Sequence, residues 1–416
     1  MQYCYVNQTT VQLTYVQQAL MQRDGSVLRI TNQSAPEAPP DQLPLQQVPR
    51  PNTRHQDVKR YQQLKLRAGL AQSLLVFVLI FALVASGLTS TLEEAIRNRT
   101  GQEYAVLLIF ALILGVVESI VSFPLRYYSS FLLEHRYGLS NQTFGAWLWQ
   151  RAKGSLVGAP FFIFLLALLY YCLDAFGPAW WLPVAAVLFI VSVVLARVAP
   201  VLIFPLFYTF RPLEEGPLRD RLLALCTSAG VAVRGLFVFN MSKTTKKANA
   251  AFTGIGRAKR IILGDTLVAN FTDEEIETIF AHELGHQTMN HLWTMMALGT
   301  LTTFVGLFLA AQLYDASLAW FGFGSRQTIA ALPLLGLWLG LISLVTTPLT
   351  NIVSRAHERR ADAYAVRLTQ NKNAFLSALN KLGRMNMADH APHPAVEFLF
   401  YSHPSLDKRI QAVEAL

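Results

Sequence analysis

The chain has 416 residues, of which 53% are hydrophobic and only 15% are charged, and its formal net charge is +9. Soluble domains usually carry about 25% charged residues, so the composition argues against a soluble globular protein and predicts a polytopic membrane protein. Cys4, Cys172 and Cys226 form no C-x-x-C pair, which argues against a disulfide scaffold or a cysteine zinc site. The basic residues are spread around hydrophobic segments, so we expect a face turned towards anionic lipid and no nucleic-acid partner.

The first 56 residues are polar and rich in glutamine, and we predict a tail without a catalytic role. Residues 19–30 contain Asp24-Gly25 between short apolar runs, a pattern typical of a small β-hairpin. The tail has no basic start followed by an apolar run, so no secretory signal is expected. Six prolines then predict an extended linker: Pro36, Pro39, Pro40, Pro44, Pro49 and Pro51.

Six long apolar segments follow, each close to the length of about 20 residues that a helix needs to cross a bilayer. They cover residues 69–88, 104–123, 156–173, 180–204, 292–313 and 329–349. Basic residues are concentrated in alternate connecting segments. By the positive-inside rule, both termini and the two polar segments at residues 209–291 and 351–416 are therefore predicted to be cytoplasmic.

The polar segment 209–291 is predicted to form a small α/β unit. Helical spacing covers residues 217–228, with Gly230 placed to end that helix, and residues 236–239 and 260–263 are typical of short strands. Thr272 and Glu275 form a T-x-x-E capping box, which predicts a helix that begins near Asp273 and runs on through two histidines.

That helix carries His282-Glu283-Leu284-Gly285-His286. The two histidines are four residues apart, so both imidazoles project from one face and can share a metal ion. Glu283 lies beside them, where a carboxylate polarises the water that zinc activates without binding the metal. The alternative is an exposed polar helix face with two unremarkable histidines.

A catalytic zinc ion needs a third protein ligand and an open position. The metzincin arrangement requires glycine and histidine three and six residues after His286, where this chain has Met289 and Leu292, so that class is excluded. His291 would point to a different face of a continuing helix and is expected to support the site or to face solvent.

Glu358 is the better candidate for the third ligand, and it shares one face of a second predicted helix with Asp362, four residues later. One carboxylate can bind zinc while the other holds a ligand histidine by its free N–H. In the alternative interpretation, these carboxylates and the neighbouring Arg359 and Arg360 form a solvated ion-pair face. His357 lies about 100° away around the helix from Glu358, so we do not expect both to bind one metal.

The H-E-L-G-H motif, followed two membrane segments later by E-x-x-A-D, resembles the CAAX prenyl protease 1 family and its relative, the bacterial heat-shock protease HtpX. Three further stretches resemble that family in the same order along the chain. They are Glu134-His135-Arg136-Tyr137-Gly138, Asn249-Ala250-Ala251-Phe252-Thr253-Gly254 and Ser402-His403-Pro404.

The resemblance implies roles for the candidate residues. His282, His286 and Glu358 would bind Zn²⁺, Glu283 would be the general base and acid, and Asp362 would support a ligand histidine. Asn249 and Ala250 would lie on an edge strand that binds the substrate backbone, and His403 would stabilise the oxyanion.

The expected fold is mainly α: a polytopic membrane helix bundle of about six or seven spans with a small α/β zincin-like catalytic domain. The expected segments are a tail (1–56), membrane helices one to four (57–208), a zincin-like segment (209–291), helices five and six (292–350) and a C-terminal catalytic segment (351–416). The implied location is a bacterial inner membrane, or the endoplasmic reticulum membrane in a eukaryote.

The resemblance implies a zinc metalloendopeptidase of CAAX prenyl protease type, acting on a peptide or protein substrate that is prenylated or membrane-bound. An HtpX-like protease for misfolded membrane proteins is the first alternative. A non-proteolytic scaffold or transporter with a relict zinc site is the second, and the intact Glu283 argues against it.

Overall fold

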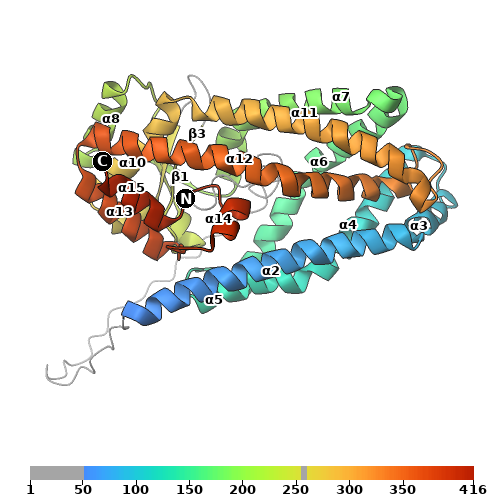
Figure 1. Cartoon of the computed structure of the whole chain (residues 1–416), viewed down its shortest axis with the longest axis horizontal. Coiled ribbons are helices and arrows are strands. Elements are labelled where there is room, and N and C mark those ends of the chain that lie inside the picture. Colours follow the sequence, from blue (N-terminus) through green and yellow to red (C-terminus); the bar gives the residue numbers. More distant parts are fainter. Residues whose placement is uncertain (1–50, 254–259) are drawn as a thin grey trace, which may run out of the picture.

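The computed structural model describes residues 51–253 and 260–416, and this part of the chain is mainly helical (Figure 1). The hairpin predicted at residues 19–30 and the proline-rich linker up to residue 50 lie outside the described residues. Any seventh span in the N-terminal tail would lie there too.

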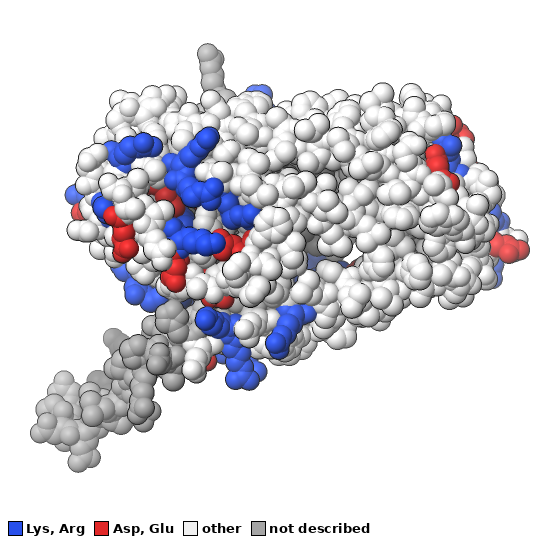
Figure 2. Space-filling model, viewed as in Figure 1, with Lys and Arg blue, Asp and Glu red and all other residues white. Residues whose placement is uncertain are grey.

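Six helical segments of the described chain are long and apolar enough to cross a membrane, in agreement with the six predicted spans. They are Gln56–Ala85, Glu103–Arg136, Phe144–Ala175, Gly177–Leu206, His291–Phe321 and Ile329–Thr369. On the face shown in Figure 2, charged side chains gather towards the two ends of the long axis, and a broad band between them has almost none. Such a band suits contact with lipid chains.

Most of the membrane helices are longer than their apolar stretches, whereas the fourth span, Gly177–Leu206, is divided into one α-helix and the short helical turns η2 (Gly177–Ala179), η3 (Ala199–Ile203) and η4 (Phe204–Leu206). Their bounds are α2 (Pro51–Ala85), α4 (Glu103–Tyr127) with η1 (Tyr128–Leu132) and α5 (Leu133–Arg136), α6 (Phe144–Ala175), α7 (Trp181–Val198), α11 (His291–Ser317) and α12 (Leu332–Thr369). A short helix, α3 (Leu88–Arg97), connects α2 and α4. Helices α11 and α12 run side by side along the molecule in Figure 1 and lead into the catalytic unit.

The catalytic unit gathers at one end of the membrane helices (Figure 1). Its helices are α8 (Pro217–Ser228), α9 (Asp265–Asn270), α10 (Asp273–Thr288), α13 (Lys372–Met385), α14 (Pro394–Phe400) and α15 (Leu406–Glu414). The predicted helix at residues 217–228 and the predicted start near Asp273 are thus confirmed. Buried side chains of α8, α10 and α13 form one core with the sheet, which fixes α10 in place.

A four-stranded sheet lies within this unit, in the order β1-β2-β4-β3. The strands are β1 (Phe210–Pro212), β2 (Leu236–Phe239), β3 (Ala250–Thr253) and β4 (Arg260–Gly264). Strand β2 is parallel to β4, while β1 and β3 are antiparallel to their neighbours. The pattern of the sequence predicted β2 and β4, whereas the edge strand β3 was expected only from the family resemblance, and β1, which has three residues, was not predicted.

Candidate active site

Helix α10 begins at Asp273, directly after the N-cap residue Thr272. Oγ1 of Thr272 accepts a hydrogen bond from the Glu275 N–H at 3.3 Å, and the Thr272 N–H donates to Oε2 of Glu275 at 2.9 Å. The Glu275 carboxylate also accepts hydrogen bonds from Ser377 at 2.6 Å and Lys381 at 2.7 Å. The capping box therefore starts the helix and also attaches it to α13, which sets the direction in which His282 projects.

Helix α10 packs closely against α12 at Gly285. A side chain at this position would bring a Cβ within 3.1 Å of the Tyr364 ring and 3.3 Å of the Ala361 Cα atom. Such distances are shorter than ordinary van der Waals contact, so the glycine permits the close approach of the two helices. The approach places the faces of α10 and α12 that carry the candidate ligands opposite each other.

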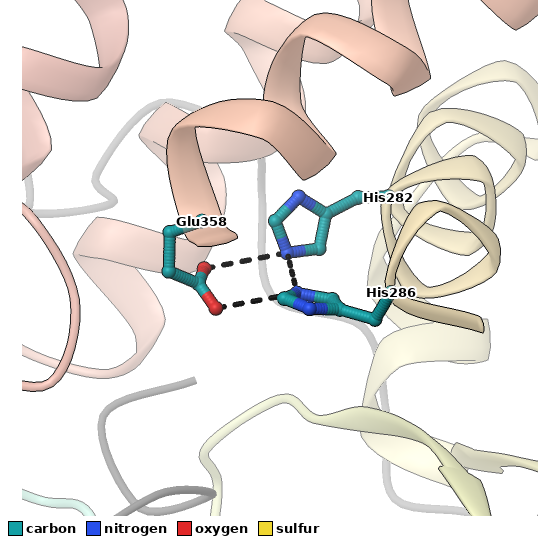
Figure 3. A group of neighbouring side chains, drawn as sticks. All are labelled: His282, His286 and Glu358. Atoms are coloured by element: carbon teal, nitrogen blue, oxygen red, sulfur yellow. Dashed lines mark hydrogen bonds and ion pairs between the residues drawn. The ribbon is translucent and has the colours of Figure 1, made fainter. Parts of the chain in front are cut away.

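His282, His286 and Glu358 converge in a buried cluster (Figure 3). The two Nε2 atoms are 3.2 Å apart, Oε1 of Glu358 is 3.2 Å from Nε2 of His286, and Oε2 of Glu358 is 3.4 Å from Nε2 of His282. A tetrahedral zinc site with bonds of about 2.0–2.1 Å separates its ligand atoms by about 3.3 Å. The spacing of the three side chains therefore fits a zinc ion.

The electrostatics of the cluster favour a positive charge at the same point. Burial lowers the pKa of His282, but the carboxylates of Asp362 and Glu358 outweigh burial and raise that pKa to about 9. Two carboxylates facing two imidazoles thus attract a cation, whether a proton or a metal ion. The charges of these side chains and the spacing of their donor atoms therefore both fit a bound metal ion.

Asp362 lies behind the ligand His282, with Oδ1 2.8 Å from Nδ1 of the imidazole. This contact orients the ring so that Nε2 faces the cluster. Arg409 in turn binds Asp362 with two hydrogen bonds, from Nε at 2.8 Å and from Nη2 at 2.6 Å. Sequence analysis missed Arg409, whose only signal is the need of a buried carboxylate for a cationic partner.

The alternative of a solvated ion-pair face does not describe this part of α12. Glu358 is 1% exposed and Asp362 is 2% exposed, whereas Arg359 and Arg360 point to solvent. The carboxylates and the arginines therefore lie on opposite faces of the helix.

His403 joins the cluster from the segment between α14 and α15. Its Nε2 lies 3.4 Å from Oε1 of Glu358, and its Nδ1 lies 2.9 Å from the Ser402 hydroxyl. Burial lowers the pKa of His403 to about 4, so the ring is neutral near pH 7. The Glu358 carboxylate beside Nε2 is an acceptor, so it favours the tautomer with the single proton on Nε2, in which Nδ1 accepts from the Ser402 hydroxyl.

Arg355 holds the segment that carries His403. Its Nη1 donates to the carbonyl oxygens of Glu397 at 3.1 Å and Tyr401 at 2.6 Å. The Glu397 carbonyl also accepts from the Tyr401 N–H at 3.1 Å, so the Arg355 guanidinium adds a second donor at the C-terminal end of α14, where basic side chains commonly bind the last carbonyl groups. The sequence carries no local signal for this contact either.

Glu283 is partly buried between the two ligand histidines along α10. Burial raises the pKa of its carboxyl group, while the imidazoles of His282 and His286 act to lower it. A carboxylate whose pKa is moved towards neutrality is suited to accept and return a proton.

His291 contradicts the helical continuation assumed from the sequence. Helix α10 ends at Thr288, Asn290 has a left-handed backbone (φ 55°), and a new helix begins at His291. The chain turns so that Nδ1 of His291 lies 3.0 Å from Nδ1 of His286. His291 therefore supports a ligand histidine, and the His357 ring stacks on it at 3.9 Å.

Asn249 and Ala250 lie at the start of β3, which is an edge strand of the sheet. The Gly264 N–H donates to the Asn249 carbonyl at 2.8 Å, so Asn249 and Gly264 form a hydrogen-bonded antiparallel pair. Because such pairs alternate along an antiparallel ladder, the N–H and C=O groups of Ala250 and Phe252 point to the open edge. That edge is able to accept another strand.

A multi-pass helix bundle with a buried His/His/Glu cluster beside a glutamate defines the class of integral membrane metallopeptidases. Comparison with known proteins identifies the family. Residues 212–416 match the model of peptidase family M48, and residues 31–209 match the CAAX prenyl protease N-terminal model, described as five membrane helices. The chain belongs to peptidase family M48 and to its CAAX prenyl protease type.

The regions matched to known relatives make up most of each relative and most of this chain. The uncharacterized metalloprotease YhfN of Bacillus subtilis (strain 168) is 30% identical over 340 residues, which are 81% of this chain and 80% of the relative. CAAX prenyl protease 1 of Saccharomyces cerevisiae is 31% identical over 330 residues, 74% of this chain and 72% of the relative. The crystal structure of S. mikatae Ste24p matches with a TM-score of 0.79 and 26% identity, over 89% of this chain and 91% of that one.

Proposed function

We propose that this protein is a zinc-dependent endopeptidase that hydrolyses a peptide bond next to the membrane. The observation that carries the proposal is the convergence of His282, His286 and Glu358 at distances that suit zinc, with Glu283 on the same helix. His282, His286 and Glu358 would hold the ion. When bound, zinc would act as a Lewis acid towards the scissile carbonyl and lower the pKa of a water molecule.

Glu283 performs the proton transfers in this proposal. Its carboxylate takes a proton from the attacking water and delivers it to the nitrogen of the leaving amine. The raised pKa of the buried carboxyl group supports both roles. Asp362 and Arg409 keep His282 oriented while charge develops in the site.

His403 stabilises the oxyanion of the tetrahedral intermediate. The support for this role is the neutral ring, the Nε2 proton directed into the site, and the 3.4 Å distance from Nε2 to Oε1 of Glu358. A fixed donor that meets a developing negative charge in a buried site is worth more than the same donor in water.

The substrate backbone adds to the open edge of β3. The N–H and C=O groups of Ala250 and Phe252 that point away from β4 would supply main-chain hydrogen bonds, which is a recognised mode of peptide binding. Asn249 lies directly before these groups, and its buried Oδ1 has no hydrogen-bond partner among the described residues. That oxygen is available to accept from a substrate N–H.

A prenylated C-terminal peptide is the substrate that the similarity to CAAX prenyl protease 1 supports. The site lies at the cytoplasmic side in this proposal, because basic residues gather at the connections on that side. The second candidate is the cleavage of misfolded membrane proteins. It is favoured if the protein comes from a bacterium, where prenylated substrates are not expected.

A pair of matched peptides distinguishes the two substrate classes. We expect the full-length protein, in detergent with zinc, to cleave a farnesylated CAAX peptide at least about tenfold faster than its unprenylated counterpart, since burying a lipid chain contributes about 0.8 kcal/mol per CH₂ group. The measurement is kcat/KM for both peptides by mass spectrometry. Equal turnover would favour the second candidate, and no turnover of either peptide, or of an unfolded membrane protein, would contradict the proposed function.

His403→Ala should reduce kcat about 100-fold, as the loss of one oxyanion donor does, while the zinc content stays at the wild-type level. KM should change little, because the donor acts mainly on the intermediate. His393→Ala is the matched control, since His393 is exposed and lies ten residues earlier in the chain. Wild-type kcat in His403→Ala would exclude the proposed role.

A further inference from the structure

The Glu134–Gly138 motif is not explained by the catalytic chemistry, although it resembles the family pattern. It ends the long helical segment that begins at Glu103. The N–H of Gly138 donates to the His135 carbonyl at 2.9 Å, and the N–H of Leu139 donates to the Glu134 carbonyl at 2.8 Å. These two bonds form a Schellman turn, which requires the positive φ of Gly138 (66°). The turn reverses the chain and directs Leu139 towards the catalytic unit.

The side chain of Glu134 is the centre of an ion-pair cluster with two lysines and a tyrosine. Its Oε2 lies 2.8 Å from Nζ of Lys247. Its Oε1 accepts a hydrogen bond from the Tyr61 hydroxyl at 2.7 Å and forms an ion pair with Lys65. Nζ of Lys247 also lies 3.2 Å from the Tyr61 hydroxyl. The side chains of Glu134 and Lys247 are only 12% and 14% exposed, so solvent screens their attraction incompletely.

The backbone around Lys247 is attached to the same turn. The N–H of Lys246 and the hydroxyl of Thr245 both donate to the Leu139 carbonyl at 2.9 Å. Thr245 also forms an isolated antiparallel bridge with Ser140. Residues 245–247 are therefore bound to the end of a membrane helix by main-chain and side-chain contacts together.

The catalytic unit holds the next residues from the other side. Asn386 accepts a hydrogen bond from the Ala248 N–H at 3.0 Å and donates one to its carbonyl at 3.1 Å. Thr266 donates to the Lys247 carbonyl at 2.7 Å. The edge strand β3 begins two residues later, at Ala250. Residues 245–248, which lead into β3, are thus bound to the membrane bundle on one side and to the catalytic unit on the other.

A π-helix precedes Glu134 directly. It covers Tyr128–Leu132, within an otherwise α-helical span. A π-turn inserts one extra residue and rotates every later side chain around the helix axis, and such turns occur frequently at functional sites. The irregularity therefore sets the direction of Glu134 towards Lys247.

We propose that Glu134 and Lys247 are positioning residues that anchor the edge strand β3 to the membrane bundle and so set how the strand receives the substrate backbone. This inference rests on the proposed function, in which β3 binds the substrate. The pair touches none of the residues of the metal cluster. Its loss should therefore weaken substrate binding and leave the metal site intact.

The test is Glu134→Gln in the full-length protein. The substitution keeps the shape of the side chain and removes the charge that the two lysines face. We expect KM to rise about tenfold with kcat within about twofold of wild type, in the range found for directly coupled residues. Zinc content should not change, and amide hydrogen exchange of residues 247–253 should become faster. Lys247→Met should reproduce these effects, and the double variant should add little to either.

Glu103→Gln is the matched control. Glu103 lies at the opposite end of the same helical segment, where its carboxylate binds Arg97, and this variant should keep the wild-type KM. Lys247→Arg retains the charge and should restore most of the affinity. Unchanged KM and unchanged exchange in an active Glu134→Gln protein would overturn the inference, and so would a loss of zinc. If the wild-type protein cleaves nothing, the proposed function fails, while hydrogen exchange still tests the anchor.

Discussion

Glu283→Gln should leave the protein with its full zinc content and reduce peptide hydrolysis by about 10³-fold or more, within the range of general acid–base catalysis. The amide has nearly the shape of the carboxylate, so the packing of α10 against α12 is retained. It has no basic oxygen of comparable strength, so neither proton transfer can take place. No other described carboxylate lies on α10 next to the ligand histidines in a position to replace it.

The measurement combines zinc analysis of the purified protein with single-turnover cleavage of the peptide. Glu277→Gln serves as the control, because Glu277 lies on the same helix and contacts only the exposed Arg221 at 3.8 Å among the described charged residues. Full activity in a zinc-loaded Glu283→Gln protein would show that another group is the general base. A loss of zinc in that variant would instead assign Glu283 to the metal.

Glu358→Ala should release the metal altogether. The substitution removes one of three ligands and leaves two buried imidazoles with Asp362 as their nearest described carboxylate. Loss of a ligand is more severe than loss of a supporting contact, which typically costs 10- to 100-fold, roughly, in metal affinity. After dialysis against a weak chelator, we expect the wild-type protein to retain about one zinc ion per chain, as a single three-ligand site requires, and the variant to retain almost none.

Arg359→Ala controls for changes in α12, since Arg359 is the exposed neighbour of Glu358. Circular dichroism and size-exclusion chromatography establish that both variants are folded. Retention of stoichiometric zinc by a folded Glu358→Ala protein would exclude Glu358 as the third ligand, and His403 would then be the next candidate to examine.

The parts of the fold that local chemistry determines are visible in the sequence. Six apolar segments are long enough to span a bilayer, and the structure has six such helices in its described part. The capping box at Thr272 marks the first turn of α10 correctly, because both of its hydrogen bonds are made within four residues. The H-E-L-G-H spacing and the E-x-x-A-D spacing each place two functional groups on one helix face.

Contacts between distant segments could not be predicted in the same way. Arg409 reaches Asp362 from the last helix, and nothing near Arg409 distinguishes it from other basic residues. Strand β3 (Ala250–Thr253) begins with two alanines, a residue type depleted in strands, and it depends on pairing with β4, so its sequence alone carries little pattern. For His291 a supporting role was one of the two expected outcomes, but the helical continuation behind that expectation was wrong, because the left-handed Asn290 breaks a helix that the periodicity of the sequence continues.

Helix α12 is one continuous helix of 38 residues with Pro348 inside it, and Glu358 lies ten residues after that proline. Glu358 is 26 residues after the first residue of the helix, which is about 39 Å along the axis. If the helix starts at one boundary of a hydrocarbon layer of about 30 Å and is neither tilted nor bent at Pro348, this carboxylate lies about 9 Å beyond the other boundary. An extended chain covers that height with about three residues. In the proposed function, the height of the site above the bilayer would then determine which peptide bond reaches it. A substrate anchored in lipid would be cut about three residues from the point where it leaves the hydrocarbon.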